Sequence, residues 1–131
     1  MHSEKQAAGG KGTIDLTKDS LGPLLARPGI VVVDCWAAWC GPCRAFAPIF
    51  AAAAARHPDV TWGKIDTEDQ RELASAFGIR SIPTLMLFRD GLLLFSQPGM
   101  LPGEALDQLV AAAQKLDMDE VRRKIAAGKA A

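Results

Sequence analysis

The sequence predicts an α/β domain in which a mixed central β-sheet carries helices on both faces. The run Ile30–Trp36 is almost continuously apolar, which is typical of a central strand buried on both sides. The next segment, 43–57, repeats apolar residues at helical spacing, and another strand pattern follows at 60–65. This strand–helix–strand order predicts parallel pairing, whereas Asp90-Gly91 between two later apolar runs predicts an antiparallel hairpin.

Local patterns predict the remaining elements. Thr67 and Gln70 form a capping-box pattern at the start of a helix, and Gly78 suits the position just after its end. Asp117 and Glu120 form a second capping-box pattern. We expect strands at 13–17 (an edge strand), 30–36, 60–65, 85–88 and 92–95. We expect helices at 17–26, 43–57, 67–77 and from 102 to about 115, and a short helix from 117.

Length and composition indicate one domain with terminal extensions. We expect residues 1–12 to be a disordered lead, residues 13–115 to form the domain, and residues 116–131 to add a helical extension. The chain carries 15 basic and 15 acidic side chains, so no charge excess points to nucleic acid or to an anionic membrane. No apolar stretch has the length of a membrane span, and the first residues do not resemble a signal peptide. Three cysteines are too few for a disulfide scaffold, so the cytoplasm is the expected compartment, and a monomer is the default expectation.

The segment Trp39-Cys40-Gly41-Pro42-Cys43 lies where the central strand gives way to a helix. Gly41 permits a turn, and Pro42 is tolerated in a first helical turn because its missing N–H would have no partner there. A helix start has unpaired N–H groups and a positive dipole end, so the pKa of Cys40 should fall below the ~8.5 of a free thiol. Cys43 lies one turn further on the same side. The pair predicts a thiol–disulfide exchange site in which Cys40 is the better exposed sulfur.

Asp34 lies inside the buried strand, where a carboxylate needs a partner or a proton. It is either a polar core residue satisfied by hydrogen bonds or a group whose pKa burial raises and which exchanges a proton with Cys43. Strand alternation places Cys35 on the opposite face, with Val31 and Val33. This third cysteine is therefore expected to be an inert core side chain.

The string Trp39–Cys43, behind Val-Val-Asp-x-Trp-Ala, resembles the active-site segment of thioredoxins. The resemblance covers roughly residues 13–115 and implies the thioredoxin fold. It implies proton exchange between Asp34 and Cys43. It also implies that Ile82-Pro83 is a cis peptide bond facing the cysteines, although the position of Pro83 alone equally suits a trans proline at a strand start.

The same resemblance implies a flat, weakly polar docking surface around the sulfur of Cys40. Its expected members are Trp39, Gly41, Pro42, Ile82, Pro83 and Gly99. The resemblance further implies a protein that binds no cofactor or metal and receives electrons from NADPH through the flavoprotein thioredoxin reductase. The other expected partners are multiple disulfide-containing proteins.

Two features depart from the commonest thioredoxin pattern. Segments 44–50 and 77–83 look closer to a second bacterial branch, whose members often carry an N-terminal zinc module with two Cys-x-x-Cys pairs, and this chain has no cysteine before Cys35. Many thioredoxins pair the buried Asp with a Lys of the neighbouring strand. Trp62 holds that place here, and Lys64 lies two residues further along the same face. Without the usual cation, the pKa of Asp34 should be higher.

The predicted function is protein disulfide reduction by the Cys40/Cys43 dithiol, through a mixed disulfide that Cys43 resolves. Three alternatives stay open. The first is a disulfide oxidase or isomerase on the same fold. The second is a binding or chaperone module in which the thiols play no part. The third is a zinc site, for which the sequence offers no second cysteine pair with suitable spacing.

Overall fold

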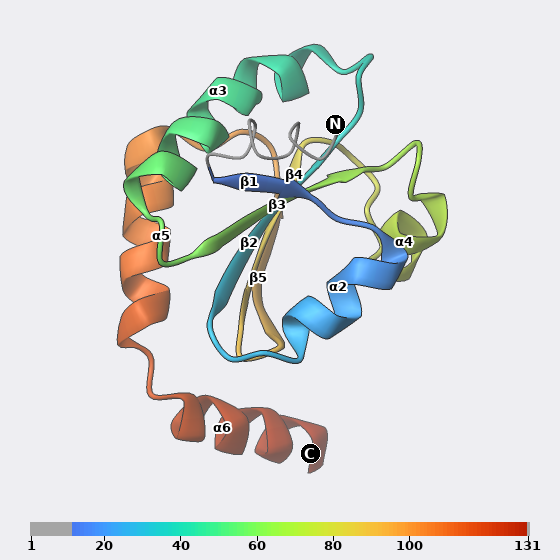
Figure 1. The fold of residues 1–131 in the computed structure, drawn as a ribbon. Helices are drawn as coiled ribbons and strands as arrows, with labels where there is room; N and C mark the ends of the chain where they lie inside the picture. The colour runs from blue at the N-terminus through green and yellow to red at the C-terminus, as the bar shows by residue number, and fades with distance from the viewer. Residues whose placement is uncertain (1–11, 131) are drawn as a thin grey trace.

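The computed structural model of the chain describes residues 12–130, so the predicted lead lies outside the described residues except for Gly12. In the described part, the predicted mixed sheet with helices on both faces is confirmed (Figure 1). The elements are β1 (Thr13–Asp15), α2 (Lys18–Leu25), β2 (Ile30–Trp36), α3 (Gly41–Arg56), β3 (Thr61–Asp66), α4 (Arg71–Ala76), β4 (Thr84–Arg89), β5 (Leu92–Pro98), α5 (Gly103–Lys115) and α6 (Met118–Ala130).

The sheet has the strand order β1-β3-β2-β4-β5, which places β2 at its centre. Strands β1, β3 and β2 run parallel, whereas β4 is antiparallel to β2 and β5 is antiparallel to β4. The predicted parallel half and closing hairpin are thus both present. Residues 31–35 of β2 are all buried, because neighbouring strands flank β2 on both edges and helices cover both faces.

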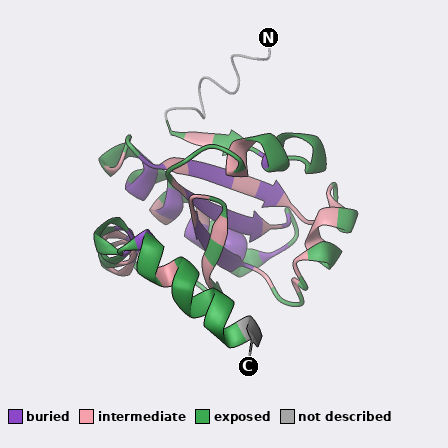
Figure 2. Cartoon of the chain, turned by 90° about the horizontal axis from the view of Figure 1, so that it is seen from below, coloured by how far each residue is buried: buried purple, intermediate pink, exposed green. Residues whose placement is uncertain are grey.

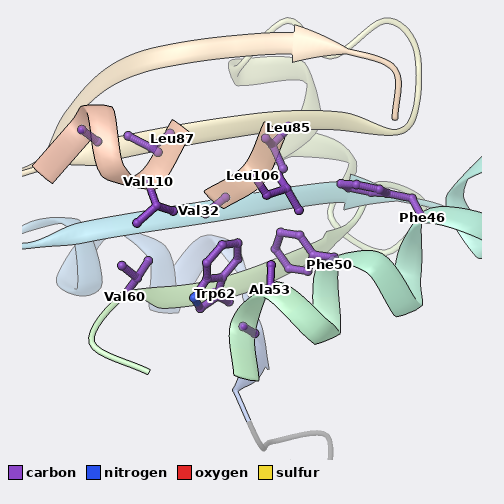
Figure 3. Packing of buried hydrophobic residues seen from close by; sticks show 12 residues of the cluster. Val32, Phe46, Phe50, Ala53, Val60, Trp62, Leu85, Leu87, Leu106 and Val110 are labelled. Atoms are coloured by element: carbon purple, nitrogen blue, oxygen red, sulfur yellow. The ribbon is translucent and has the colours of Figure 1, made fainter. Parts of the chain in front are cut away.

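Different helices cover the two faces of the sheet. On one face, α3 and α5 pack against β2, β3 and β4 through a cluster that contains Val32, and the rings of Phe50 and Trp62 meet edge to face at 5.3 Å (Figure 3). On the other face, α2 and α4 pack over a second cluster that contains Val33 and Cys35. Side-chain alternation along β2 explains this division, and it confirms the predicted orientation of Cys35.

The start of α4 corrects one sequence prediction: Thr67 and Gln70 do not form a capping box, and the helix has no side-chain cap. The Thr67 hydroxyl instead donates to the carbonyl of Trp36 at 3.1 Å, and the Gln70 side-chain oxygen accepts the N–H of Lys18 at 3.0 Å. Both side chains therefore tie the approach to α4 to neighbouring elements. The helix end agrees with the prediction, because Gly78 follows it with a φ of +66°.

The β4–β5 hairpin turns at Asp90 and Gly91, as predicted. Both residues have positive φ, 52° and 81°, which is the conformation of the tight turns that match strand twist. A Cβ at Gly91 would also lie 2.8 Å from the carbonyl oxygen of Leu25. The Asp90 carboxylate accepts the N–H of Gly29 at 2.8 Å, so the hairpin is joined to the turn that leads into β2.

Helix α6 confirms that the C-terminal extension is helical. The Asp117 carboxylate accepts the N–H groups of Asp119 and Glu120 at 3.0 and 3.2 Å, which is the Asp117 half of the predicted capping box. Figure 2 shows that most of this helix is exposed. The division into a domain at 13–115 and an extension stays a prediction. Within residues 12–130, no helix combines the length and apolar character that crossing a bilayer requires.

Candidate active site

The predicted cysteine pair lies where the chain passes from β2 into α3. Cys40 is the N-cap of α3, and Gly41 and Pro42 are the first two helical residues. Cys40 and Cys43 form a disulfide with their Cα atoms 5.2 Å apart. The backbone N–H of Cys43 lies 3.2 Å from Sγ of Cys40. This N–H is one of the donors that a helix start leaves without an intrahelical partner, so Sγ of Cys40 occupies a position that favours negative charge.

The two sulfur-bearing residues differ little in exposure. The accessible fraction of Cys40 is 4 % and that of Cys43 is 2 %. Cys40 is thus the more exposed of the two, as predicted, but both are buried in the disulfide form. Trp36, Ala37 and Ile82 pack against the pair. A partner therefore meets only a small exposed area, which belongs chiefly to the first cysteine.

The loop before β4 lies beside the disulfide. Ile82-Pro83 is a cis peptide bond, as the resemblance to thioredoxins implies, and the carbonyl oxygen of Ile82 lies 3.7 Å from Sγ of Cys40. Gly99 donates its N–H to the carbonyl of Pro83 at 2.8 Å and has a φ of +103°, a conformation that favours glycine. The structure thus brings three of the predicted docking residues together at Cys40.

Trp39 is the most exposed large apolar side chain in the described part of the chain, with 67 % of its surface accessible. It immediately precedes Cys40, and together with Ile82 it borders a hollow of about 400 Å³. The hollow is also lined by Arg71 and Arg80, to which the sequence analysis gave no role. Only the fold shows that α4 and the loop before β4 meet beside the cysteines.

Asp34 is fully buried, and within residues 12–130 neither carboxylate oxygen has a hydrogen-bond partner. By alternation it shares its sheet face with Val32, which packs under α3. Burial raises the pKa of Asp34 from 3.8 to about 6, and the positive charge of Lys64 offsets part of this rise. The described residues therefore favour the second sequence interpretation, a carboxyl group with a raised pKa, over a hydrogen-bonded core residue.

The expectation that Asp34 lacks a cation on the neighbouring strand is wrong. Lys64, not Trp62, pairs with Asp34 across β2 and β3, and its positive charge lowers the pKa of that carboxyl group. Its ammonium lies 5.0 Å from the centre of the Trp36 ring, a cation–π arrangement. The predicted place of Lys64 on the same face as Trp62 follows from their spacing along β3. The contact with Trp36 could not be predicted, because it depends on the register between two parallel strands.

Cys35 lies across the sheet from the active-site pair and is fully buried. Burial, with a smaller contribution from the charge of Asp34, raises the pKa of its thiol to about 12. The inert core role expected for Cys35 agrees with both observations. Among the described residues, no group of three or more His, Cys, Asp or Glu side chains could hold a metal ion, so the zinc alternative finds no ligand set there.

A disulfide-forming cysteine pair at the start of the helix that follows a central strand is the arrangement of a thiol–disulfide oxidoreductase. The thioredoxin family model matches residues 13–112. The chain belongs to the thioredoxin family. Members of this family normally bind no cofactor, and they act on disulfide-containing proteins. The fold and the activity class predicted from the sequence are therefore confirmed.

Individual relatives support the same assignment. The chain is 50 % identical over 114 residues to a candidate thioredoxin 2 of Streptomyces coelicolor, covering 87 % of this chain and 85 % of that protein. It is 41 % identical over 100 residues to a thioredoxin of Alicyclobacillus acidocaldarius, covering 76 % and 95 %. Among solved structures, a mutant thioredoxin from Halobacterium salinarum superposes with a TM-score of 0.75 at 31 % identity, covering 80 % of this chain and 93 % of that chain. Spinach chloroplast thioredoxin f gives 0.73 at 29 %, covering 79 % and 95 %.

Proposed function

We propose that this thioredoxin reduces disulfides in several other proteins, with electrons that NADPH supplies through thioredoxin reductase. The observation that carries the proposal is the Cys40–Cys43 disulfide at the start of α3, with Sγ of Cys40 beside the Ile82 carbonyl. A helix start stabilises the thiolate that attacks, and the exposed backbone next to it offers a place for an extended substrate segment.

The reaction starts from the reduced pair. The Cys40 thiolate attacks one sulfur of the substrate disulfide, which forms a bond between Cys40 and the substrate and expels the other substrate sulfur as a thiolate. The Cys43 thiolate then attacks Sγ of Cys40, which closes the Cys40–Cys43 disulfide and expels the second substrate sulfur. Two electrons pass to the substrate, and two protons end on its thiols. Thioredoxin reductase then restores the dithiol with two electrons from NADPH.

In this proposal, Asp34 accepts the proton that the Cys43 thiol must lose before it attacks. With a pKa of about 6, the carboxyl group is mostly ionised at pH 7 and can accept a proton. Asp34 shares its sheet face with Val32, which packs against α3, and Cys43 lies in the first turn of α3. Both residues are buried, so water competes little for the transfer. Lys64 keeps the pKa of Asp34 from rising further, which preserves its ability to act as a base.

Recognition is assigned to a docking surface around Cys40, whose members come from three parts of the chain. They are Trp39, Gly41, Pro42, Ile82, Pro83 and Gly99. Because the surface presents backbone groups and an exposed aromatic ring, it suits extended segments of many proteins. We further propose that the protein acts as a monomer in the cytoplasm, where a free cysteine pair stays reduced and catalytic.

The test is NADPH consumption with thioredoxin reductase and insulin. We expect turnover by the wild type and by the matched control Cys35→Ala, and none by Cys40→Ser. Continued turnover by Cys40→Ser would disprove its role as the nucleophile. Absence of turnover by the wild type, with intact thiols, would overturn the reductase assignment and favour the oxidase or binding-module alternatives.

A further inference from the structure

A hollow of about 400 Å³ lies between α4 and the loop that precedes β4. Trp39 and Ile82 form its border with the active site. Because the Ile82 carbonyl is 3.7 Å from Sγ of Cys40, a segment that runs along Ile82 while its cysteine is held at that sulfur lies at the edge of this hollow. The hollow is therefore open to side chains of a segment bound at Cys40.

The charged side chains that line the hollow do not cancel. Glu68 and Arg71 form an ion pair at 2.9 Å, so together they contribute little net charge. Arg80 is exposed and makes no ion pair or side-chain hydrogen bond in the described part of the chain. Its guanidinium offers five N–H donors in a planar fork that matches a carboxylate. The hollow thus has one unpaired positive group, next to hydroxyl-bearing side chains of Thr67 and Ser81.

We propose that Arg80 makes this thioredoxin prefer substrates with an Asp or Glu within about two residues of the attacked cysteine. Arg80 stands two residues before Ile82, and both side chains line the same hollow. In an extended substrate segment, the second residue from the attacked cysteine lies about 7 Å from it, at about 3.3 Å per residue, and its side chain can enter the hollow that Arg80 lines. The proposal rests on the proposed reductase function and adds a substrate class to it.

The test compares peptide disulfides that differ in one residue. Symmetric disulfides of short single-cysteine peptides carry Glu, Gln or Lys two positions before or after the cysteine. The pre-reduced protein is mixed with each peptide, and its oxidation is followed by tryptophan fluorescence to obtain a rate constant. This value is divided by the rate constant with which dithiothreitol reduces the same peptide, which corrects for the intrinsic reactivity of each peptide disulfide. No reductase is needed.

We expect the wild type to reduce the Glu peptide about two to five times faster than the Gln peptide, the range of one exposed ion pair. The Lys peptide should be reduced most slowly. Adding about 0.5 M salt should bring the three rates together, because salt screens the interaction between exposed charges. Arg80→Gln should lower the Glu-to-Gln ratio to about one. The matched control Arg27→Gln removes an exposed arginine that does not line the hollow, and it should keep the wild-type ratio.

Two results would overturn the inference while leaving the reductase function standing. One is reduction of the Glu and Gln peptides at equal corrected rates. The other is an unchanged preference in Arg80→Gln. If the pre-reduced wild type reduced none of the peptides, the proposed function itself would fail, and the inference with it.

Discussion

Replacing Asp34 by asparagine is expected to stabilise the oxidised protein by about 3 kcal/mol at neutral pH. The wild-type carboxylate is fully buried, and none of the described residues gives it a hydrogen bond. Burial raises its pKa from 3.8 to about 6. The pKa difference is about two units, and each unit corresponds to about 1.4 kcal/mol, so the ionised carboxylate costs about 3 kcal/mol of unfolding free energy. This is a large part of the stability of a typical domain.

The direction of the pH dependence follows from which state holds the proton more tightly. The folded protein binds the Asp34 proton more tightly than the unfolded chain does, because the pKa is higher in the folded state. The stabilising effect of protonation is therefore fully present below pH 3.8 and is lost as the pH rises through about 6. The asparagine side chain of the variant cannot lose a proton. The stability difference between variant and wild type should grow from about pH 4 to about pH 7 and then stay constant.

Urea unfolding of the oxidised proteins, followed by the fluorescence of the three tryptophans, measures this difference across the pH range. Asp69→Asn is the matched control, since it removes an exposed carboxylate and should give a difference that is nearly independent of pH. A difference for Asp34→Asn that is equally flat would refute the reasoning. So would a variant that is less stable than the wild type at pH 7.5.

Three further predictions use other contacts of the structure. Lys64→Met keeps an apolar stem but removes the charge that lowers the pKa of Asp34. In the Lys64→Met background, the stability gained by Asp34→Asn should therefore extend its rise to higher pH in the same urea experiment. Gly63→Ala should lower the free energy of unfolding by about 1–3 kcal/mol in urea, as typical of overpacking, because its new Cβ would collide with the side chain of Leu16. In the reduced native protein, a chromogenic disulfide reagent should titrate two thiols quickly and Cys35 only after unfolding, because burial raises the pKa of that thiol to about 12.

The sequence was sufficient to predict the features that depend on neighbours along the chain. The apolar run Ile30–Trp36 identified the central strand, and alternation along it correctly separated Asp34 from Cys35. The Asp90-Gly91 pair predicted the hairpin, since few other residues adopt two successive positive φ values. The cysteine pair was placed at the start of a helix because glycine and proline between the cysteines favour that turn.

The sequence was insufficient where a side chain finds its partner in a distant segment. Thr67 and Gln70 have the right spacing for a capping box, but the fold offers them the Trp36 carbonyl and the Lys18 N–H, and those contacts prevail. The place of Arg80 in the hollow that Trp39 and Ile82 border likewise depends on how the loop before β4 packs against α4. No local pattern encodes either contact.

Asp34 connects the stability of the fold with the proposed chemistry. A buried carboxylate that no described group neutralises lowers stability at neutral pH, and an asparagine or a leucine would remove that cost. The same burial gives the group a pKa of about 6, close enough to neutrality to take a proton from a thiol and release it again. An unburied carboxylate would be too weak a base for that exchange. In the proposed mechanism, the destabilising environment of Asp34 is therefore the source of its reactivity, and Lys64 limits both effects.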